Sequence, residues 1–382
     1  MKFTRALALF VSTTSLLSLI VGFSSSATAA GNPNCSAVDG DYIVTFTPGV
    51  SVDREIKSAP GKGISAKFKY KNAINGFAAN LTAEQVCAFE KRPNIESIEL
   101  DGLVSIEATR SNATWGLDRI DSKAPSVLLD TAYNFTTSGV GVTAYVIDTG
   151  IQSNHPDLVG AVIPGYSSIA GGTEDCNGHG THVAGTIGGN IYGVASDVTL
   201  VPIRVLGCDG SGTNSGVIAG VDHVKGAAAG NTGKSVANMS LGGGISSALD
   251  TAVNNLISSG VVVVVAAGNS RADACKSSPA RVPAAITVAA SDRNNAFASF
   301  SNRGKCVDII APGVSITSTW INSGVSTISG TSMASPHVAG AVARYLQSGI
   351  SAAQVINDSA LNAINSVPRG TTNKFLFLAP NK

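Results

Sequence analysis

The chain has 382 residues, which is too long for one minimal module and suits two domains, or one sizeable domain with an appendage. Its 26 Lys and Arg balance 25 Asp and Glu, so charge gives no reason to expect nucleic acid or an acidic membrane as a partner. Charged residues form only 13% of the chain and glycines number 42, which is typical of a compact protein with many tight turns rather than a disordered one.

The first 30 residues have the design of a secretion signal. Basic Lys2 and Arg5 precede an apolar stretch over residues 6–23, and small residues follow over residues 27–30. A permanent membrane span is the alternative, but serines and threonines interrupt the stretch and no later segment reaches the ~20 apolar residues that a span requires. We therefore expect residues 1–30 to be a signal peptide and the protein to be secreted.

Six cysteines in an exported chain favour disulfides over metal ligands, because none lies in a Cys-x-x-Cys pair. Several pairings are formally possible. If the chain forms the two domains described next, Cys35 and Cys87 pair within the first. Four cysteines then remain for the second domain: Cys176, Cys208, Cys275 and Cys306.

The pattern over residues 41–107 predicts a small α+β domain. Strands are expected over residues 42–47, 64–70, 77–81 and 95–100, with one helix after the first strand and another before the last. The second helix opens with a capping box, Thr82 to Gln85, in which the Thr side chain accepts from a first-turn amide and the Gln side chain reaches back. The β-α-β-β-α-β order is the ferredoxin-like arrangement.

Residues 108–114 are polar and lack periodicity, so they predict an exposed linker of the kind that proteases cut. We expect maturation cleavage in this linker. The domains expected after the signal peptide are therefore residues 31–108 and residues 109–382.

Buried strands alternate with helices in the second domain. Strands are expected over residues 140–147, 199–205, 236–241, 261–267 and 285–288, and helices over residues 216–229 and 246–259. This alternation predicts an α/β domain with a parallel sheet and helices on both faces. Reactive groups in such a sheet gather beyond the carboxyl ends of the strands.

Three reactive side chains lie where an expected strand ends or an expected helix begins. Asp148 ends a buried strand, where a carboxylate is costly unless it has a hydrogen-bond partner. An aspartic protease is one alternative, but no second carboxylate in a matching loop is evident. His179 lies between two glycines, and His182 one helical turn later raises the alternative of a zinc site, for which no further ligand is evident.

Ser332 begins the last long helix expected, where unpaired amides and positive partial charge lie beside its hydroxyl. A simple helix N-cap is the alternative. A serine becomes a nucleophile when a base takes its proton and a third group holds that base. Asp148 and His179 supply both groups.

The order Asp, His, Ser is the order found in subtilisin. The segments that carry it are Val146-Ile147-Asp148-Thr149-Gly150, Asn177-Gly178-His179-Gly180-Thr181-His182 and Ser329-Gly330-Thr331-Ser332-Met333-Ala334-Ser335-Pro336-His337. From Trp115 onward the chain resembles the subtilases of the proteinase K branch, and residues 236–244 resemble its aqualysin-like secreted members. Residues 41–107 resemble the inhibitory propeptide of the same family.

The resemblance implies a subtilisin-like α/β domain, with a mostly parallel central sheet flanked by helices, after a ferredoxin-like propeptide domain. It implies a secreted serine endopeptidase made as a self-processing zymogen, in which Asp148 orients His179, His179 is the general base and Ser332 attacks the peptide. Asn269 would donate to the oxyanion together with the Ser332 backbone N–H. Activity should rise as His179 loses its proton near pH ~6.5.

The resemblance also implies that substrate lies as an added extended strand between two edge strands, in pockets without charge that prefer apolar or aromatic side chains. The matching residues are Gly210, Ser211, Gly212, Ser240, Leu241, Gly242, Ala266, Ala267 and Gly268.

Disulfides Cys176–Cys208 and Cys275–Cys306 are implied by the aqualysin-like enzymes. Asp308 with the carbonyls of Pro283 and Ala285 matches a family site for structural calcium, and Asp118 and Asp121 resemble part of another. No cofactor is expected for catalysis.

The expected partners are polypeptide substrates and the chain's own propeptide, and the expected state is a monomer. One rival function passes the same acyl-enzyme to an amine, as a peptide ligase would. Another is an inactive protease fold kept for binding, which would need a broken triad.

Overall fold

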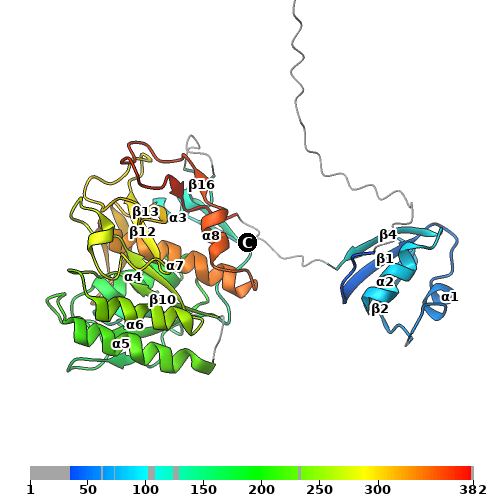
Figure 1. Ribbon diagram of the computed structural model, residues 1–382, viewed down its shortest axis with the longest axis horizontal. Helices are drawn as coiled ribbons and strands as arrows, with labels where there is room; N and C mark the ends of the chain where they lie inside the picture. Colours follow the sequence, from blue (N-terminus) through cyan, green and yellow to red (C-terminus); the bar gives the residue numbers. More distant parts are fainter. Residues whose placement is uncertain are drawn as a thin grey trace, which may run out of the picture. The chain divides into compact units, whose positions relative to one another are not determined.

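The computed structural model describes residues 35–61, 63–72, 74–101, 108–123, 129–230 and 234–379. The chain divides into two compact units, Met1–Val104 and Ser105–Lys382 (Figure 1). The signal peptide expected over residues 1–30 lies outside the described residues. Within the described ranges, no helix combines the length and the hydropathy that a membrane crossing needs.

The first unit is a four-stranded antiparallel sheet covered by two helices. Its elements are β1 (Gly40–Phe46), α1 (Val52–Lys57), β2 (Ala66–Tyr70), β3 (Gly76–Leu81), α2 (Ala83–Glu90) and β4 (Ile95–Leu100). The strand order β2-β3-β1-β4 places the first strand between the last two, so the expected ferredoxin-like arrangement is confirmed.

Aromatic packing and a helix cap stabilise this unit. The buried rings of Phe46 and Phe89 both contact that of Phe77, at centroid distances of 6.0 and 5.6 Å. The capping box of α2 is confirmed: Thr82 Oγ1 accepts from Gln85 N at 3.2 Å, and Gln85 Oε1 accepts from Thr82 N at 3.1 Å.

The disulfide Cys35–Cys87 joins the segment before β1 to α2, across a sequence separation of 52 residues. Closing a loop of that length removes entropy from the unfolded chain, so replacing both cysteines with serine should cost this unit about 4 kcal/mol of unfolding free energy. Urea unfolding of the full chain, followed by probes in this unit, measures the loss. Serines at Cys275 and Cys306 provide the control, since they should leave this transition unchanged.

The second unit is built on a nine-stranded sheet in the order β16-β17-β13-β12-β11-β10-β7-β9-β8. Its strands are β7 (Thr143–Asp148), β8 (Tyr166–Ser167), β9 (Thr199–Arg204), β10 (Ser235–Met239), β11 (Val262–Ala266), β12 (Ile286–Ser291), β13 (Ile309–Pro312), β16 (Ala360–Leu361) and β17 (Lys374–Phe375). All neighbours are parallel except β16 and β17. The mostly parallel sheet expected is therefore confirmed, with β8, β13, β16 and β17 in addition.

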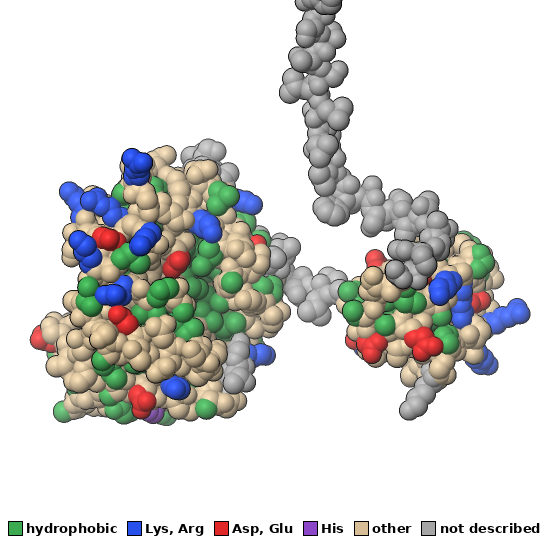
Figure 2. Space-filling model, in the orientation of Figure 1, with side chains coloured by type: hydrophobic (Ala, Val, Ile, Leu, Met, Phe, Trp, Pro, Cys, Tyr) green, Lys and Arg blue, Asp and Glu red, His purple; other side chains and the backbone are tan. Residues whose placement is uncertain are grey.

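Helices cover both faces of this sheet (Figure 1). They are α3 (Trp115–Ile120), α4 (His179–Gly188), α5 (Asn214–Ala227), α6 (Ser247–Ser258), α7 (Thr331–Gln347) and α8 (Ala353–Asn357), with short 3₁₀ turns at Ala228–Gly230 and Ala274–Lys276. One core lies beneath α5 and α6, and a larger one beneath α4 and α7. Because both faces are covered, strands such as β11 are buried almost throughout, which is why four consecutive valines suit it. On the face shown in Figure 2, hydrophobic, basic and acidic side chains lie interspersed.

The first half of the linker expected at residues 108–114 forms a strand, although Thr109 and Ser111 are exposed as expected. Strand β5 (Ala108–Ser111) pairs antiparallel with β6 (Ala132–Phe135). Arg110 donates to the carbonyls of Ile191 and Gly193, at 3.3 and 2.6 Å, and its guanidinium lies over aromatic rings of β6. These tertiary contacts order a segment whose own sequence has no strand periodicity.

A second small sheet, the hairpin of β14 (Ile316–Trp320) and β15 (Gly324–Ile328), packs on α4. Hydroxyls of Ser318 and Thr319 in this hairpin donate to the carbonyls of His182 and Thr181, at 2.9 and 2.7 Å. The hairpin thereby fixes the first turn of α4 from outside the main sheet.

Candidate active site

Three elements bring the reactive side chains to one end of the second unit. Asp148 is the last residue of β7 and is fully buried, His179 is the first residue of α4, and Ser332 is the second residue of α7. The alternative in which Ser332 only caps its helix is wrong, because Gly330 occupies the N-cap position.

Asp148 and His179 are joined by a hydrogen bond. Nδ1 of His179 lies 2.7 Å from Oδ1 of Asp148, and that oxygen also accepts from Thr149 N at 2.8 Å. The His179 side chain is 24% exposed, so its other ring nitrogen is open to a reactant while Asp148 is not. This arrangement holds one tautomer of the ring.

The pKa of His179 is raised above its ordinary value. Burial of the ring lowers this pKa, but the charge and hydrogen bond of Asp148, aided by the charge of Asp175, outweigh burial. His182, on the same helix, is buried and bonds to the carbonyl of Ile316 at 3.0 Å, so the two histidines have different partners. A neutral His179 base is thus reached at higher pH than the ~6.5 expected from the sequence.

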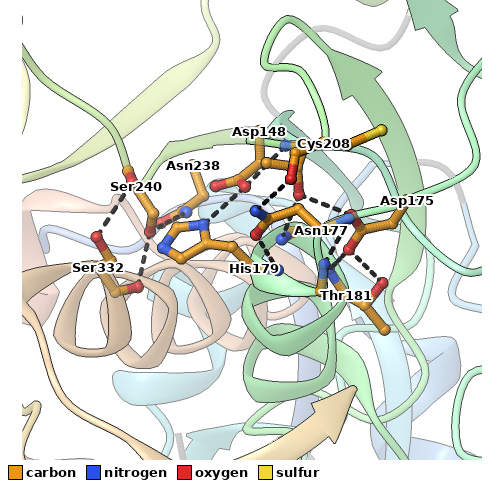
Figure 3. Close-up of polar contacts among 12 residues, drawn as sticks. Asp148, Asp175, Asn177, His179, Thr181, Cys208, Asn238, Ser240 and Ser332 are labelled. Atoms are coloured by element: carbon orange, nitrogen blue, oxygen red, sulfur yellow. Dashed lines mark hydrogen bonds and ion pairs between the residues drawn. The ribbon is translucent and has the colours of Figure 1, made fainter. Parts of the chain in front are cut away.

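Ser332 and Ser240 are joined by two hydrogen bonds. Ser332 Oγ donates to the Ser240 carbonyl at 3.1 Å, and Ser240 Oγ donates to the Ser332 carbonyl at 2.8 Å. Among the described residues, the Ser332 hydroxyl therefore bonds to the Ser240 carbonyl. The sequence pattern had instead predicted a bond from this hydroxyl to His179. Figure 3 shows the His179 imidazole between Asp148 and Ser332. A change of the Ser332 side-chain rotamer would therefore turn its hydroxyl from the Ser240 carbonyl toward this imidazole.

Asn269, just beyond β11, is tied to the first turn of α7. Its Oδ1 accepts from the backbone N–H and the hydroxyl of Thr331, at 2.8 and 2.9 Å. Because Oδ1 is occupied on this side, the amide is oriented and its NH₂ group is left to donate elsewhere. A Cβ placed on Gly330 would lie 3.5 Å from that nitrogen, which locates the NH₂ group beside the start of α7.

Two adjoining hollows meet at the segment Leu241–Gly243. One, of about 420 Å³, is lined by His179, Gly210, Ser211, Gly212, Ser240, Leu241 and Gly242 among others. The other, of about 350 Å³, is lined by Leu241, Gly242, Ala266, Ala267, Gly268, Asn269 and Ser332 among others. All nine expected substrate-binding residues therefore line a hollow, and no Asp, Glu, Lys or Arg is among the lining residues of either.

The two segments expected to act as edge strands are not strands in the structure. Residues 210–212 and 240–242 lie outside the strands of the described sheet, since β10 ends at Met239. A strand is defined by its hydrogen-bonded partner, and here an extended peptide would itself be that partner.

Disulfides hold the loops near this end. Cys176 is bonded to Cys208 and Cys275 to Cys306. The first of these bridges lies three residues before His179 and is covered by Arg204, whose guanidinium bonds to Cys176 Sγ at 3.1 Å.

Two carboxylates that the resemblance implies for calcium sites, Asp308 and Asp121, accept backbone hydrogen bonds in this unit. Asp308 Oδ2 accepts from Thr287 N at 2.9 Å; burial raises the pKa of Asp308, and the Thr287 bond and the charge of Lys374 lower it in part. Burial, with a smaller contribution from the charge of Asp118, raises the pKa of Asp121 to about 6, although hydrogen bonds from Asn134 lower it in part.

Asp175 also belongs to the site, although the sequence pattern gives no prediction for it. Its carboxylate accepts hydrogen bonds in the turn before α4 (Figure 3). An Asp placed shortly before the first residue of a helix is the available signal, since acidic side chains cap helix N-termini.

Comparisons with known proteins agree with this geometry. The model of the subtilase family matches residues 139–371, and that of peptidase inhibitor I9 matches residues 41–107. The chain is 50% identical over 327 residues to alkaline serine exoprotease A of Vibrio alginolyticus, covering 82% of this chain and 60% of that protein. It is 54% identical over 287 residues to an extracellular serine proteinase of Thermus sp. (strain Rt41A), covering 73% of this chain and 68% of that one.

A solved structure is also similar. The crystal structure of a cold adapted subtilisin-like serine proteinase matches with a TM-score of 0.66 and 54% identity, covering 70% of this chain and 98% of that chain. All these names describe serine proteases, and none supports the peptide-ligase alternative.

Proposed function

The chain belongs to the subtilase family, and from that premise we propose that it is a secreted serine endopeptidase made as an inhibited precursor. The observation that carries the proposal is the 2.7 Å pairing of Asp148 with His179 beside Ser332, at the edge of two uncharged hollows. Secretion is supported by the Thermus relative, which is named an extracellular serine proteinase, and by the signal design of residues 1–30.

The proposed mechanism uses only residues of this chain and water. Ser332 Oγ attacks the peptide carbonyl while His179 takes its proton, and Asp148 stabilises the resulting imidazolium. His179 then gives that proton to the departing amine, which leaves an acyl-enzyme on Ser332. A water molecule, activated by the same imidazole, hydrolyses the acyl-enzyme and restores the serine.

The oxyanion of each tetrahedral intermediate would be held by the NH₂ group of Asn269 and by the backbone N–H of Ser332. Replacing Asn269 with alanine should lower kcat by about 100- to 1,000-fold with little change in KM, because the lost donor acts mainly in the transition state. Steady-state hydrolysis of a chromogenic peptide measures this split. Asn254→Ala serves as the control, because Asn254 is exposed on α6, where its Nδ2 donates to Asp250 O at 2.9 Å, and it lines neither hollow.

Substrate would lie extended between residues 210–212 and 240–242, with the side chain before the scissile bond in the hollow walled by residues 266–268. The absence of charged lining residues around both described hollows favours apolar or aromatic side chains. Nucleic acid and membranes are not proposed as partners, and a monomer suffices because one chain supplies the whole site.

The first unit would act as the intramolecular inhibitor. The proposed signal peptide spans residues 1–30, the propeptide domain residues 31–108 and the peptidase domain residues 109–382. The proposed maturation cut lies at the start of β5. A cut farther along residues 108–114 would remove the strand that pairs with β6.

Structural calcium is also proposed. The Asp308 carboxylate and the carbonyls of Pro283 and Ala285 are hard oxygen donors of the kind that Ca²⁺ prefers. At 100-fold excess over its Kd, calcium should add about 3 kcal/mol to the unfolding free energy, and chelation should remove it. Thermal unfolding with calcium or EDTA, in the wild type and in Asp308→Asn, tests this, since the variant should lose the calcium-dependent difference.

A fluorophosphonate probe tests the function directly. It should label Ser332 covalently, as peptide mapping by mass spectrometry would show, and His179→Ala should abolish labelling. Cleavage of a peptide blocked at both ends separates an endopeptidase from an exopeptidase. Labelling at another residue, or none in a folded sample, would refute the proposal.

A further inference from the structure

Asp148 and His179 belong to different elements, so something must hold β7 and α4 in register. Building on the proposed protease activity, we infer that Asp175 is a positioning residue, which ties the loop before α4 to the end of β7 and so keeps the His179 imidazole against Asp148.

The carboxylate of Asp175 accepts five hydrogen bonds. Oδ1 accepts from Thr149 Oγ1 at 2.9 Å, from Asn177 N at 2.9 Å and from Gly178 N at 3.0 Å. Oδ2 accepts from Thr181 N at 2.9 Å and from Thr181 Oγ1 at 2.7 Å. The two oxygens thus bind both sides of the turn that carries His179.

Thr149 makes the connection to β7, because it directly follows Asp148. Its buried hydroxyl donates to Asp175 and accepts from Gly180 N at 2.9 Å. One hydrogen-bonded chain therefore runs from Thr149, through Asp175, to residues before and after His179. Figure 3 shows the part of this chain from Asp175 to Thr181.

Two further contacts shape the turn without joining it to β7. Gly178 has φ 109°, and a Cβ there would lie 2.3 Å from the Trp320 ring, so the ring supports the turn from the hairpin side. Asn177 Oδ1 accepts from His179 N at 3.2 Å within the same turn. Asp175, unlike Asn177 and the Trp320 ring, bonds to the loop that follows Asp148, through the Thr149 hydroxyl.

The charge of Asp175 gives this role a distinctive readout. The charged groups that act on His179 are Asp148 at the end of β7, Asp175 in the preceding loop and His182 on α4. The two carboxylates raise the pKa of His179, and a protonated His182 would oppose them. Removing the Asp175 charge should shift the acid limb of the pH profile of kcat/KM to lower pH, which a purely structural residue would not do.

The experiment compares Asp175→Asn with Asp157→Asn. Asp157 is also buried and accepts a backbone hydrogen bond, from Ile191 N at 2.7 Å, but it lies beyond the other end of α4. Asp175→Asn should lower kcat about 100-fold, since small misplacements of catalytic groups have effects of that size, with KM changed less than about twofold. Asp157→Asn should lower Tm and leave kcat and the pH profile unchanged.

Thr149→Val and Thr149→Ser keep the inference testable if Asp175→Asn does not fold. The valine removes the link to β7 and should lower kcat, whereas the serine keeps the hydroxyl and should restore it. A wild type that hydrolyses peptides together with an Asp175→Asn of unchanged kcat and pH profile would overturn the inference and leave the proposed function intact. Loss of Tm alone, as in Asp157→Asn, would also overturn it. An inactive, unlabelled wild type would instead refute the proposed function.

Discussion

Ser332→Ala should reduce kcat for peptide hydrolysis by about a million-fold and should leave the precursor uncut. Without the hydroxyl no acyl-enzyme forms, and His179 has no proton to accept from this side chain. The residual rate would come from binding and from the oxyanion donors, which remain. Gel analysis of the purified precursor over time measures maturation, and a chromogenic peptide measures hydrolysis.

Ser329→Ala is the matched control for that result. Ser329 is exposed, three residues earlier, and its hydroxyl accepts from Ser315 N at 2.8 Å without touching the catalytic side chains. This variant should mature and hydrolyse peptides like the wild type. A Ser332→Ala chain that matures by itself in pure form would contradict the self-processing mechanism.

The second unit should lose stability between pH 6.5 and pH 4 because of two buried histidines. Burial lowers the pKa of His182 and of His337 to about 4, although each ring keeps a hydrogen bond to a backbone carbonyl. Unfolded histidine titrates near 6.5, so the unfolded chain binds more protons than the folded one in this window. The stabilisation is complete above pH 6.5 and is lost as pH falls through the window, by about 3 kcal/mol for each histidine.

Both histidine rings are enclosed by the protein, since His182 is fully buried and His337 is 1% exposed. Nδ1 of His182 is buried with no hydrogen-bond partner among the described residues, and a Cβ on Gly116 would lie 2.6 Å from Nε2 of His337. A protonated ring at either place would therefore add an unpaired buried charge to a packed core.

Urea unfolding from pH 7 to pH 4 tests this, using the calcium-loaded Ser332→Ala chain so that self-cleavage does not interfere. His182→Gln and His337→Gln should each be less stable at pH 7 but should lose less stability on acidification. Asp121 titrates in the opposite sense, because its raised pKa lets the folded state take up protons first, so the difference between each variant and its parent is the decisive quantity. Equal pH slopes in variant and parent would contradict the prediction.

The local patterns of the chain determined much of the architecture. Runs of β-branched residues such as residues 262–265 are stable only in a sheet covered on both faces, so they specified parallel buried strands. The capping box at Thr82 depends on residues three positions apart, and sequence displays such local relations directly. The three motif segments, recognised together, pointed to Asp148, His179 and Ser332.

Tertiary structure decided what depends on distant neighbours. Strand β5 exists because β6 and the Arg110 contacts supply partners that no local pattern reveals. The Ser332 hydroxyl bonds to Ser240, and the pKa of His179 is raised, because folding sets the distances and burial that govern these interactions. The role of Asp175 could not be predicted from the sequence for the same reason. The donors of its five hydrogen bonds lie between Thr149 and Thr181 in the sequence, and only the fold brings them around one carboxylate.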